Sequence, residues 1–201
     1  GNGPVTVRSS SIVGNSAETD GGGTYQHPIL FQNSIVALNS SPNVDNVCGS
    51  LKPGSSNNLF DVDPGFIRSP SYGPDGLFGG GDDDYGDLRL SFLSDAVDQG
   101  DASLLPQDVH DLDGDGDETE PLPFDLEGNV RVDGNALDIG AYESEFVYLP
   151  KPTVLFVDAD STYDSSEPGA GNSWATAFAD LQDALEFAET WNHDADPLMK
   201  V

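Results

Sequence analysis

Carboxylates gathered in the second half of the chain have the clearest capacity for chemistry. They are Asp111, Asp113, Asp115, Asp117, Glu118, Glu120 and Asp125. Alternate carboxylates lie on one side of a tight loop, and Gly114 and Gly116 allow the loop to bend. Calcium prefers roughly six to eight hard oxygen ligands, which such a loop supplies. We therefore predict a Ca²⁺ site with the ligands Asp111, Asp113, Asp115, Asp117, Glu120 and Asp125.

The same loop matches only part of a known calcium motif. Its opening, Asp111-x-Asp113-x-Asp115-Gly116, is the first half of an EF-hand loop. The twelfth position is Leu122, where an EF-hand has a bidentate glutamate. The missing ligand must then come from elsewhere, with Glu120 or Asp125 as candidates. The alternative interpretation is a solvated acidic loop that holds no ion.

A second acidic run, Asp82-Asp83-Asp84, is a weaker metal candidate. Consecutive side chains of an extended chain point in opposite directions, so the three carboxylates cannot all face one ion there. A solvated turn is the better interpretation. Asp61 and Asp63 flank a turn before Pro64, where structural capping is favoured over metal binding.

Net charge limits the partners of the chain. Seven Lys and Arg residues face 36 Asp and Glu residues, for a formal charge of −29. Such a charge opposes compaction unless cations neutralise it. It argues against nucleic acid and anionic membrane surfaces, which both need a basic face. No apolar run is long enough to span a bilayer, so membrane insertion is not expected.

Enzyme signatures are missing from the sequence. His27, His110 and His193 lack the spacing of a zinc site, and no nucleophile elbow, phosphate loop or dinucleotide fingerprint occurs. We assign no catalytic residues and expect a protein that is not an enzyme. The single cysteine, Cys48, rules out an internal disulfide and is expected to be a small buried side chain.

Short strands are expected to carry these loops over residues 1–150. Gly and Pro total 37 residues, which disfavours long helices. Ser11-Ile12-Val13-Gly14-Asn15 recurs from Ser34 to Asn39, with the serines 23 residues apart. Each copy follows a strand-like stretch, Val5–Val7 or Ile29–Phe31. A period in the low twenties is typical of one coil of a β-solenoid.

The last fifty residues have a different character. The apolar run Val154–Val157 predicts a continuous strand, and a helix is predicted over about Asp180–Trp191 with Asp180 as N-cap. One apolar stripe is expected on this helix, because four apolar residues follow helical spacing. They are Leu181, Ala184, Leu185 and Ala188. The stripe belongs either to an ordinary packed helix or to a cap over the open end of a solenoid.

Several segments, in order, resemble bacterial extracellular right-handed parallel β-helix surface proteins of the pectate-lyase-like group. The first series contains Asn33-Ser34-Ile35-Val36, Asp63-Pro64-Gly65-Phe66-Ile67, Gly86-Asp87-Leu88-Arg89-Leu90, Ser94-Asp95-Ala96-Val97-Asp98-Gln99-Gly100, Asp111–Gly116, Arg131-Val132 and Asp138-Ile139-Gly140-Ala141-Tyr142-Glu143. This series is similar to the end of a solenoid in the group. Asp95 departs from it, since the group usually has Pro there.

A second series resembles the beginning of such a solenoid, with its opening strand and capping helix. It contains Leu155–Asp160, Gly171–Phe178 and Leu181-Gln182-Asp183-Ala184-Leu185. The resemblance implies an all-β, right-handed parallel β-helix with irregular acidic loops and one short capping α-helix. It further implies that residues 1–150 form the end coils of one β-helix and residues 151–201 the start of a following or neighbouring one.

The order of these parts leads to a functional expectation. If the chain is a whole subunit, its C-terminal strand and helix complement the first coil of another copy, head to tail. The interface would comprise Val154, Leu155, Phe156, Val157, Leu181, Ala184, Leu185, Ala188, Val5, Val7 and Ile12. We expect a secreted or cell-surface structural, adhesive protein that forms a calcium-stabilised filament with copies of itself. The alternatives are a fragment of a tandem protein and a carbohydrate-binding or polysaccharide-degrading β-helix module.

Overall fold

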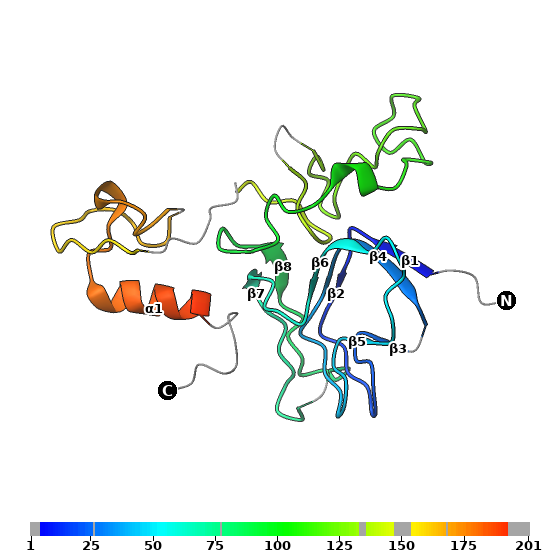
Figure 1. Ribbon diagram of the computed structural model, residues 1–201, viewed down its shortest axis with the longest axis horizontal. Helices are drawn as coiled ribbons and strands as arrows, with labels where there is room; N and C mark the ends of the chain where they lie inside the picture. Colours follow the sequence, from blue (N-terminus) through cyan, green and yellow to red (C-terminus); the bar gives the residue numbers. More distant parts are fainter. Residues whose placement is uncertain are drawn as a thin grey trace. The chain divides into compact units, whose positions relative to one another are not determined.

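The chain divides into two compact units, Gly1–Tyr148 and Leu149–Val201. A computed structural model describes residues 5–25, 27–76, 78–132, 136–146, 154–167 and 169–192 (Figure 1). Each unit has an apolar cluster of its own. No helix in the described part of the chain is long and apolar enough to cross a membrane.

A small parallel sheet is the main element of the first unit (Figure 1). Its central strand β4 (Ile29–Val36) pairs on one side with β1 (Val5–Arg8) and β2 (Ser11–Ile12), and on the other side with β6 (Ser56–Phe60). Val5 lies opposite Ile29, and Gln32 lies opposite Ser56. Apolar side chains of this sheet fill the core.

The strand register of this sheet aligns the asparagines of the two sequence repeats, Asn15 and Asn39, and not their serines, Ser11 and Ser34. Ser11 pairs with Ile35, one residue beyond the Ser34 that the repeat matches to it. The Asn39 Oδ1 accepts hydrogen bonds from the Asn15 backbone N–H at 3.0 Å and from its side-chain amide at 2.9 Å. Because buried backbone groups must find partners, these amide contacts fix an offset that the serine spacing does not reveal.

A left-handed residue at the centre of β4 divides this strand between two apolar clusters. Asn33 is fully buried with φ of 51°, and it interrupts the alternation of the strand. Phe31 before it and Val36 after it join one cluster, whereas Ile35 joins the other. An amide side chain is tolerated here because asparagine adopts this conformation more readily than most residues.

Two further strand pairs complete the described sheets. β3 (Thr24–Tyr25) pairs parallel with β5 (Val47–Cys48), and the Cys48 side chain is only partly buried. β7 (Phe66–Arg68) pairs antiparallel with β8 (Asp87–Leu90). A short 3₁₀ helix, Ala102–Leu104, follows.

The predicted right-handed parallel β-helix is wrong. The short strands form separate small sheets, two parallel and one antiparallel, and the described residues contain no solenoid. Parallel pairing in the main sheet ends at β6, and the next pair, β7 with β8, runs antiparallel. Beyond Leu90, and apart from the short 3₁₀ helix, the described part of the first unit is irregular chain with turns and isolated bridges. Glycine-rich and aspartate-rich loops favour local turns over long ladders.

The second unit departs from the predicted strand but contains the predicted helix. Residues 154–157 do not form a strand; Val157 makes only an isolated bridge with Phe178. Helix α1 (Leu181–Asn192) is confirmed, and the Asp180 carboxylate accepts a hydrogen bond from the Gln182 backbone N–H at 2.6 Å. A 3₁₀ turn, Trp174–Thr176, lies before it.

Only part of the predicted apolar stripe of α1 is buried. Ala184 is 3% exposed, whereas Leu181 and Leu185 are 61% and 53% exposed. The ring of Phe187 instead packs on Phe178, with centroids 5.0 Å apart. These two large rings determine which face of the helix contacts the unit. Leu181 and Leu185 lie outside this contact and are exposed.

Candidate metal centre and a buried polar network

Carboxylates from residues 108 to 120 converge in two overlapping groups. In one group, Asp111, Asp113 and Asp115 each offer an oxygen within 4.8 Å of the others. In the other, Asp113 meets Asp108 and Glu120 under the same limit. Asp113 thus belongs to both groups, and the loop presents four other acidic side chains around it.

Local hydrogen bonds fold this loop. The Asp111 carboxylate accepts from the Gly116 N–H at 3.0 Å, and Asp113 accepts from the Asp115 N–H at 3.2 Å. Asp111 and Gly114 have φ angles of 49° and 77°, in the left-handed region. These turns hold the carboxylates close together although like charges repel.

Asp108 is a member that sequence reasoning missed. It is 1% exposed, and its carboxylate accepts from the Leu112 N–H at 2.6 Å and the His110 N–H at 3.3 Å. Its own N–H donates to the Glu120 carbonyl at 2.8 Å, which closes the loop. Asp108 lies three residues before Asp111 and so falls outside the every-second-residue spacing of the aspartates. Its place at the start of a turn is the one sequence signal that could have identified it.

Glu120 is the least satisfied member. Its Oε1 atom is buried and has no hydrogen-bond partner. Burial raises the pKa of Glu120, and the nearby carboxylates of Asp113 and Asp115 raise it further. A divalent cation beside these oxygens would replace the missing partner and remove the repulsion.

Two predicted ligands lie outside both groups. The Asp117 carboxylate accepts from the Thr119 N–H at 2.9 Å and from its hydroxyl at 2.6 Å. Asp125 is 9% exposed, and its two oxygens accept four N–H donors from Glu127, Asn129 and Glu143. Both oxygens of Asp125 are saturated and leave no free acceptor for a metal ion, whereas both bonds to Asp117 go to its Oδ1.

A cavity of about 400 Å³ adjoins the second group. Asp113, Glu120 and Arg131 contribute its polar lining. Apolar residues form the rest of the wall: Leu105, Pro121, Leu122, Pro123, Phe124, Val130 and Val132.

The second acidic run also brings carboxylates together, in the group Asp75, Asp82 and Asp83. The Asp83 carboxylate already accepts hydrogen bonds from backbone N–H groups of its own turn. The Gly79 N–H, which donates to it at 2.7 Å, lowers the pKa of Asp83. Asp84 belongs to no group and instead forms an exposed ion pair with Arg68 at 3.0 Å. These contacts favour the interpretation of this run as a turn over that of a metal site.

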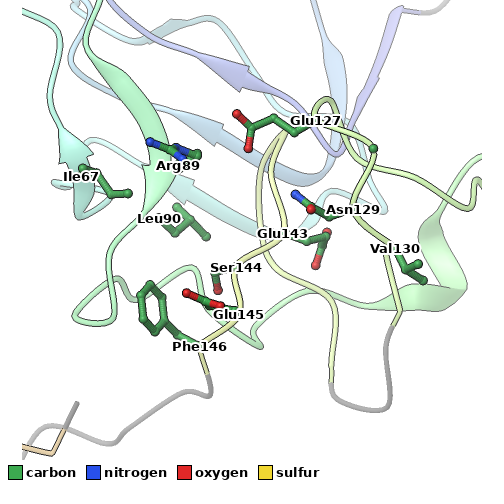
Figure 2. A pocket seen from close by; sticks show the side chains of 11 residues that line it. Ile67, Arg89, Leu90, Glu127, Asn129, Val130, Glu143, Ser144, Glu145 and Phe146 are labelled. Atoms are coloured by element: carbon green, nitrogen blue, oxygen red, sulfur yellow. The ribbon is translucent and has the colours of Figure 1, made fainter. Parts of the chain in front are cut away.

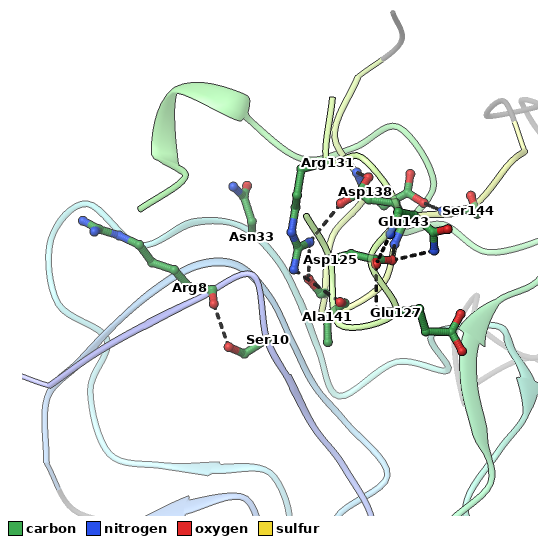
Figure 3. A network of polar contacts seen from close by, with 12 residues as sticks. Arg8, Ser10, Asn33, Asp125, Glu127, Arg131, Asp138, Ala141, Glu143 and Ser144 are labelled. Atoms are coloured by element: carbon green, nitrogen blue, oxygen red, sulfur yellow. Dashed lines mark hydrogen bonds and ion pairs between the residues drawn. The ribbon is translucent and has the colours of Figure 1, made fainter. Parts of the chain in front are cut away.

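Figure 3 shows a separate polar network around Arg131. Arg131 is 5% exposed, and its guanidinium donates to Glu143 at 2.9 Å and to the carbonyls of Gly140 and Ala141 at 3.2 Å. The other oxygen of Glu143 accepts from the Asp138 N–H at 2.9 Å. This network ties together residues 125–143 of the first unit.

The buried acids of this network differ in proton affinity. Burial raises the pKa of Glu143 to about 8; the charge of Asp138 acts in the same direction, and Arg131 opposes it. Burial also raises the pKa of Asp138. Burial alone would raise the pKa of Asp125, but N–H donors such as that of Glu143 outweigh it and hold this pKa below the ordinary value.

Beside this network lies a cavity of about 580 Å³, shown in Figure 2. Arg89 and Leu90 of β8 and Ile67 of β7 line it together with loop residues. The loop residues are Glu127, Gly128, Asn129, Val130, Glu143, Ser144, Glu145 and Phe146. Its charged lining is mainly acidic, and Arg89 already pairs with Asp87.

The expected interface residues differ in exposure. Val7 and Ile12 pack on the cluster of β4, and Leu155, Val157 and Ala184 pack on Phe178 within the second unit. The Phe156 ring lies against Trp174, with centroids 5.0 Å apart, and Ala188 is partly buried. Four of these residues remain exposed: Val5, Val154, Leu181 and Leu185.

Comparison with known proteins adds no relative. No family model matches the chain, no curated protein matches it, and no solved structure matches it. Any functional assignment therefore depends on the residues themselves.

Proposed function

We propose that the protein is an extracellular structural module that Ca²⁺ stabilises through the loop from Asp108 to Glu120. One observation carries this proposal. The buried Oε1 of Glu120 lacks a hydrogen-bond partner while its carboxylate lies beside those of Asp108 and Asp113. A hard cation is the ligand that carboxylate oxygens in this arrangement attract.

Charge supports the choice of a cation. The chain has a formal charge of −29, and this loop gathers four further carboxylates around that of Asp113. A bound Ca²⁺ would stabilise the folded state because the unfolded chain does not hold these oxygens together. Asp125 is not available for this role, because both of its oxygens already accept N–H donors.

We propose further that copies of the chain associate head to tail. Val5 is 45% exposed on β1 of the first unit, and Leu181 and Leu185 are exposed on α1 of the second unit. Exposed apolar residues on two different units suit a heterologous contact that repeats from copy to copy. Assembly would cover apolar area that the single chain leaves in water.

A saccharide ligand is a second candidate, favoured by the cavity lined by Asp113, Glu120 and Arg131. A polysaccharide lyase would need a basic residue beside the calcium as proton acceptor. Arg131 occupies that place, but its guanidinium already donates to Glu143 and to two carbonyls. This arrangement supports saccharide binding more than bond cleavage.

Calorimetry with CaCl₂ tests the calcium proposal. We expect the wild type to bind Ca²⁺ and to melt at higher temperature with it, and Glu120→Gln to lose most of both effects. Glu118→Gln is the matched control, because it removes the same charge from the same loop. Glu118 is exposed and belongs to neither group of carboxylates. Equal calcium responses of the two variants would refute the site.

A further inference from the structure

A cluster of three aromatic rings lies in the loop that joins β7 to β8 (Figure 1). The rings of Tyr72 and Phe78 meet edge to face with centroids 5.7 Å apart, and those of Phe78 and Tyr85 meet with centroids 6.3 Å apart. Tyr72 and Tyr85 are 54% and 57% exposed. Exposed aromatic rings gathered in one place are typical of a binding surface.

This aromatic cluster is attached to the rest of the first unit. The Phe78 carbonyl accepts a hydrogen bond from the Ser16 hydroxyl at 3.1 Å, and a Cβ on Gly14 would lie 3.5 Å from the Phe78 ring. At the base of the loop, Ser71 and Asp84 exchange backbone hydrogen bonds at 2.8 and 3.0 Å. The two tyrosines directly follow these two residues in the sequence. A surface held in this way loses little conformational entropy when a ligand binds.

The charge around the aromatic cluster is negative. Residues 69–86 contain four aspartates and no basic residue. The Tyr85 hydroxyl donates to the Asp83 carboxylate at 3.4 Å, so one ring lies directly beside an acid. The carboxylates of Asp75 and Asp82 each have an oxygen within 4.8 Å of one of Asp83. The exposed rings thus adjoin several negative charges that no positive side chain of the loop neutralises.

Rings and carboxylates together favour an organic cation as ligand. The face of an aromatic ring attracts a cation, and a guanidinium stacks flat on such a face while its N–H groups donate to a carboxylate. Asp82 is exposed, and no described residue donates a hydrogen bond to its carboxylate, so it can accept such donors. An anionic ligand would be repelled by the same charges.

The guanidinium has to come from another polypeptide. Each of the four arginines of this chain already has a side-chain partner. Arg8 donates to Gln32, and the other three form ion pairs: Arg68, Arg89 and Arg131. A second copy would also add its own formal charge of −29. Charge complementarity therefore selects a basic partner.

We propose that Tyr72, Phe78 and Tyr85, with the carboxylates of Asp82 and Asp83, form a docking surface for an arginine side chain of a basic partner polypeptide. The guanidinium stacks on an exposed tyrosine ring and donates to the adjacent carboxylates. This docking surface shares no residue with the proposed calcium site, so either proposal can fail without the other.

NMR titration of the tyrosine ring signals tests the docking surface on the full chain in EDTA. One probe is the capped peptide acetyl-Gly-Arg-Gly-amide, and the other carries citrulline, which has nearly the shape of arginine without its charge. We expect the rings of Tyr72 and Tyr85 to respond to the arginine peptide only. Equal responses to both peptides, or responses confined to other parts of the chain, would overturn the proposal. A neutral glucose tetrasaccharide that shifts these rings when the arginine peptide does not would identify a saccharide surface instead.

Tyrosine variants separate stacking from general attraction to an acidic protein. Tyr72→Leu with Tyr85→Leu should weaken binding of the arginine peptide about tenfold. Tyr72→Leu alone, which keeps the bond between Tyr85 and Asp83, should weaken it about threefold. The control is Tyr25→Leu, which removes an exposed tyrosine outside the cluster and should change binding less than about twofold. Equal effects of Tyr72→Leu and Tyr25→Leu would refute the role of the cluster.

A second pair of variants tests the carboxylates. Asp82→Asn should weaken binding more than Glu118→Gln, which makes the same charge change at an exposed position outside this loop. The backbone amide signals of Gly79 and Gly80 report binding in all variants, because both groups donate to Asp83. Equal losses in the two variants would show that overall charge, and not this surface, attracts the peptide.

Discussion

Asn33 and Asp101 form a reciprocal pair across 68 positions of sequence: the Asn33 amide donates to the Asp101 carbonyl at 2.9 Å and accepts from the Asp101 N–H at 2.9 Å. Asn33 is fully buried in β4, whereas Asp101 precedes the short 3₁₀ helix. One side chain thus satisfies both backbone groups of a residue in irregular chain. This pairing attaches the loops beyond residue 100 to the sheet.

Asn33→Ala should destabilise the first unit strongly. The change leaves two backbone groups of Asp101 without partners and places alanine at φ of 51°. We expect a loss of about 2–4 kcal/mol in the free energy of unfolding, measured by urea denaturation.

Asn57→Ala is the matched control for this change. Asn57 also has positive φ, but it is exposed and donates one hydrogen bond, to the Gln99 carbonyl at 3.0 Å. Its loss should be clearly smaller. Equal losses would show that backbone conformation, and not the reciprocal pair, determines the stability.

Glu120→Gln should have opposite effects with and without calcium. Without Ca²⁺ the variant should melt above the wild type, because the change removes one charge from a group of like charges. With saturating Ca²⁺ the order should reverse, because a ligand oxygen is lost. Differential scanning calorimetry in EDTA and in CaCl₂ measures both. A variant that melts below the wild type in EDTA would contradict the role of repulsion.

Replacing Arg131 alone should lower the free energy of unfolding more than replacing Arg131 and Glu143 together. Arg131→Met leaves the buried Glu143 carboxyl group without its guanidinium, and we expect a loss of about 3–5 kcal/mol. Arg131→Met combined with Glu143→Gln should recover part of this loss. Chemical denaturation of the single and double variants gives the coupling energy, and simple additivity would argue against a coupled pair.

Two exposed leucines test association of the chain. Leu181→Ser with Leu185→Ser should change the unfolding free energy of the single chain by only about 1 kcal/mol, since both side chains lie in solvent. If copies join through α1, sedimentation velocity should show assemblies of the wild type that the variant lacks. Identical sedimentation of the two proteins would count against head-to-tail assembly.

Local signals in the sequence predicted local structure well. Asp180 marked the start of α1, and the helical spacing of the apolar residues after it indicated the helix. Alternate aspartates also indicated three carboxylates that the fold brings together, those of Asp111, Asp113 and Asp115. These features depend on contacts between residues close in sequence, which a single sequence displays.

Features that depend on distant contacts were not predictable in this way. The sequence repeat suggested a continuing solenoid, but the pairing of Phe66 with Leu90 runs antiparallel and ends the series. Asp108 reaches Glu120 only through closure of the loop, and Asp125 is saturated by donors from 127 to 143. Composition alone gave no sign that Glu143, outside the acidic run, is the buried acid with the raised pKa.

The conformation of Asn33 has a consequence for cooperativity. Because this residue switches the parity of β4, Phe31 and Ile35 of one short strand anchor different apolar clusters. Loss of packing in one cluster should therefore also destabilise the other, because both clusters include residues of the same eight-residue strand. The first unit should melt as one body despite its many loops, and weakening either cluster should lower a common transition.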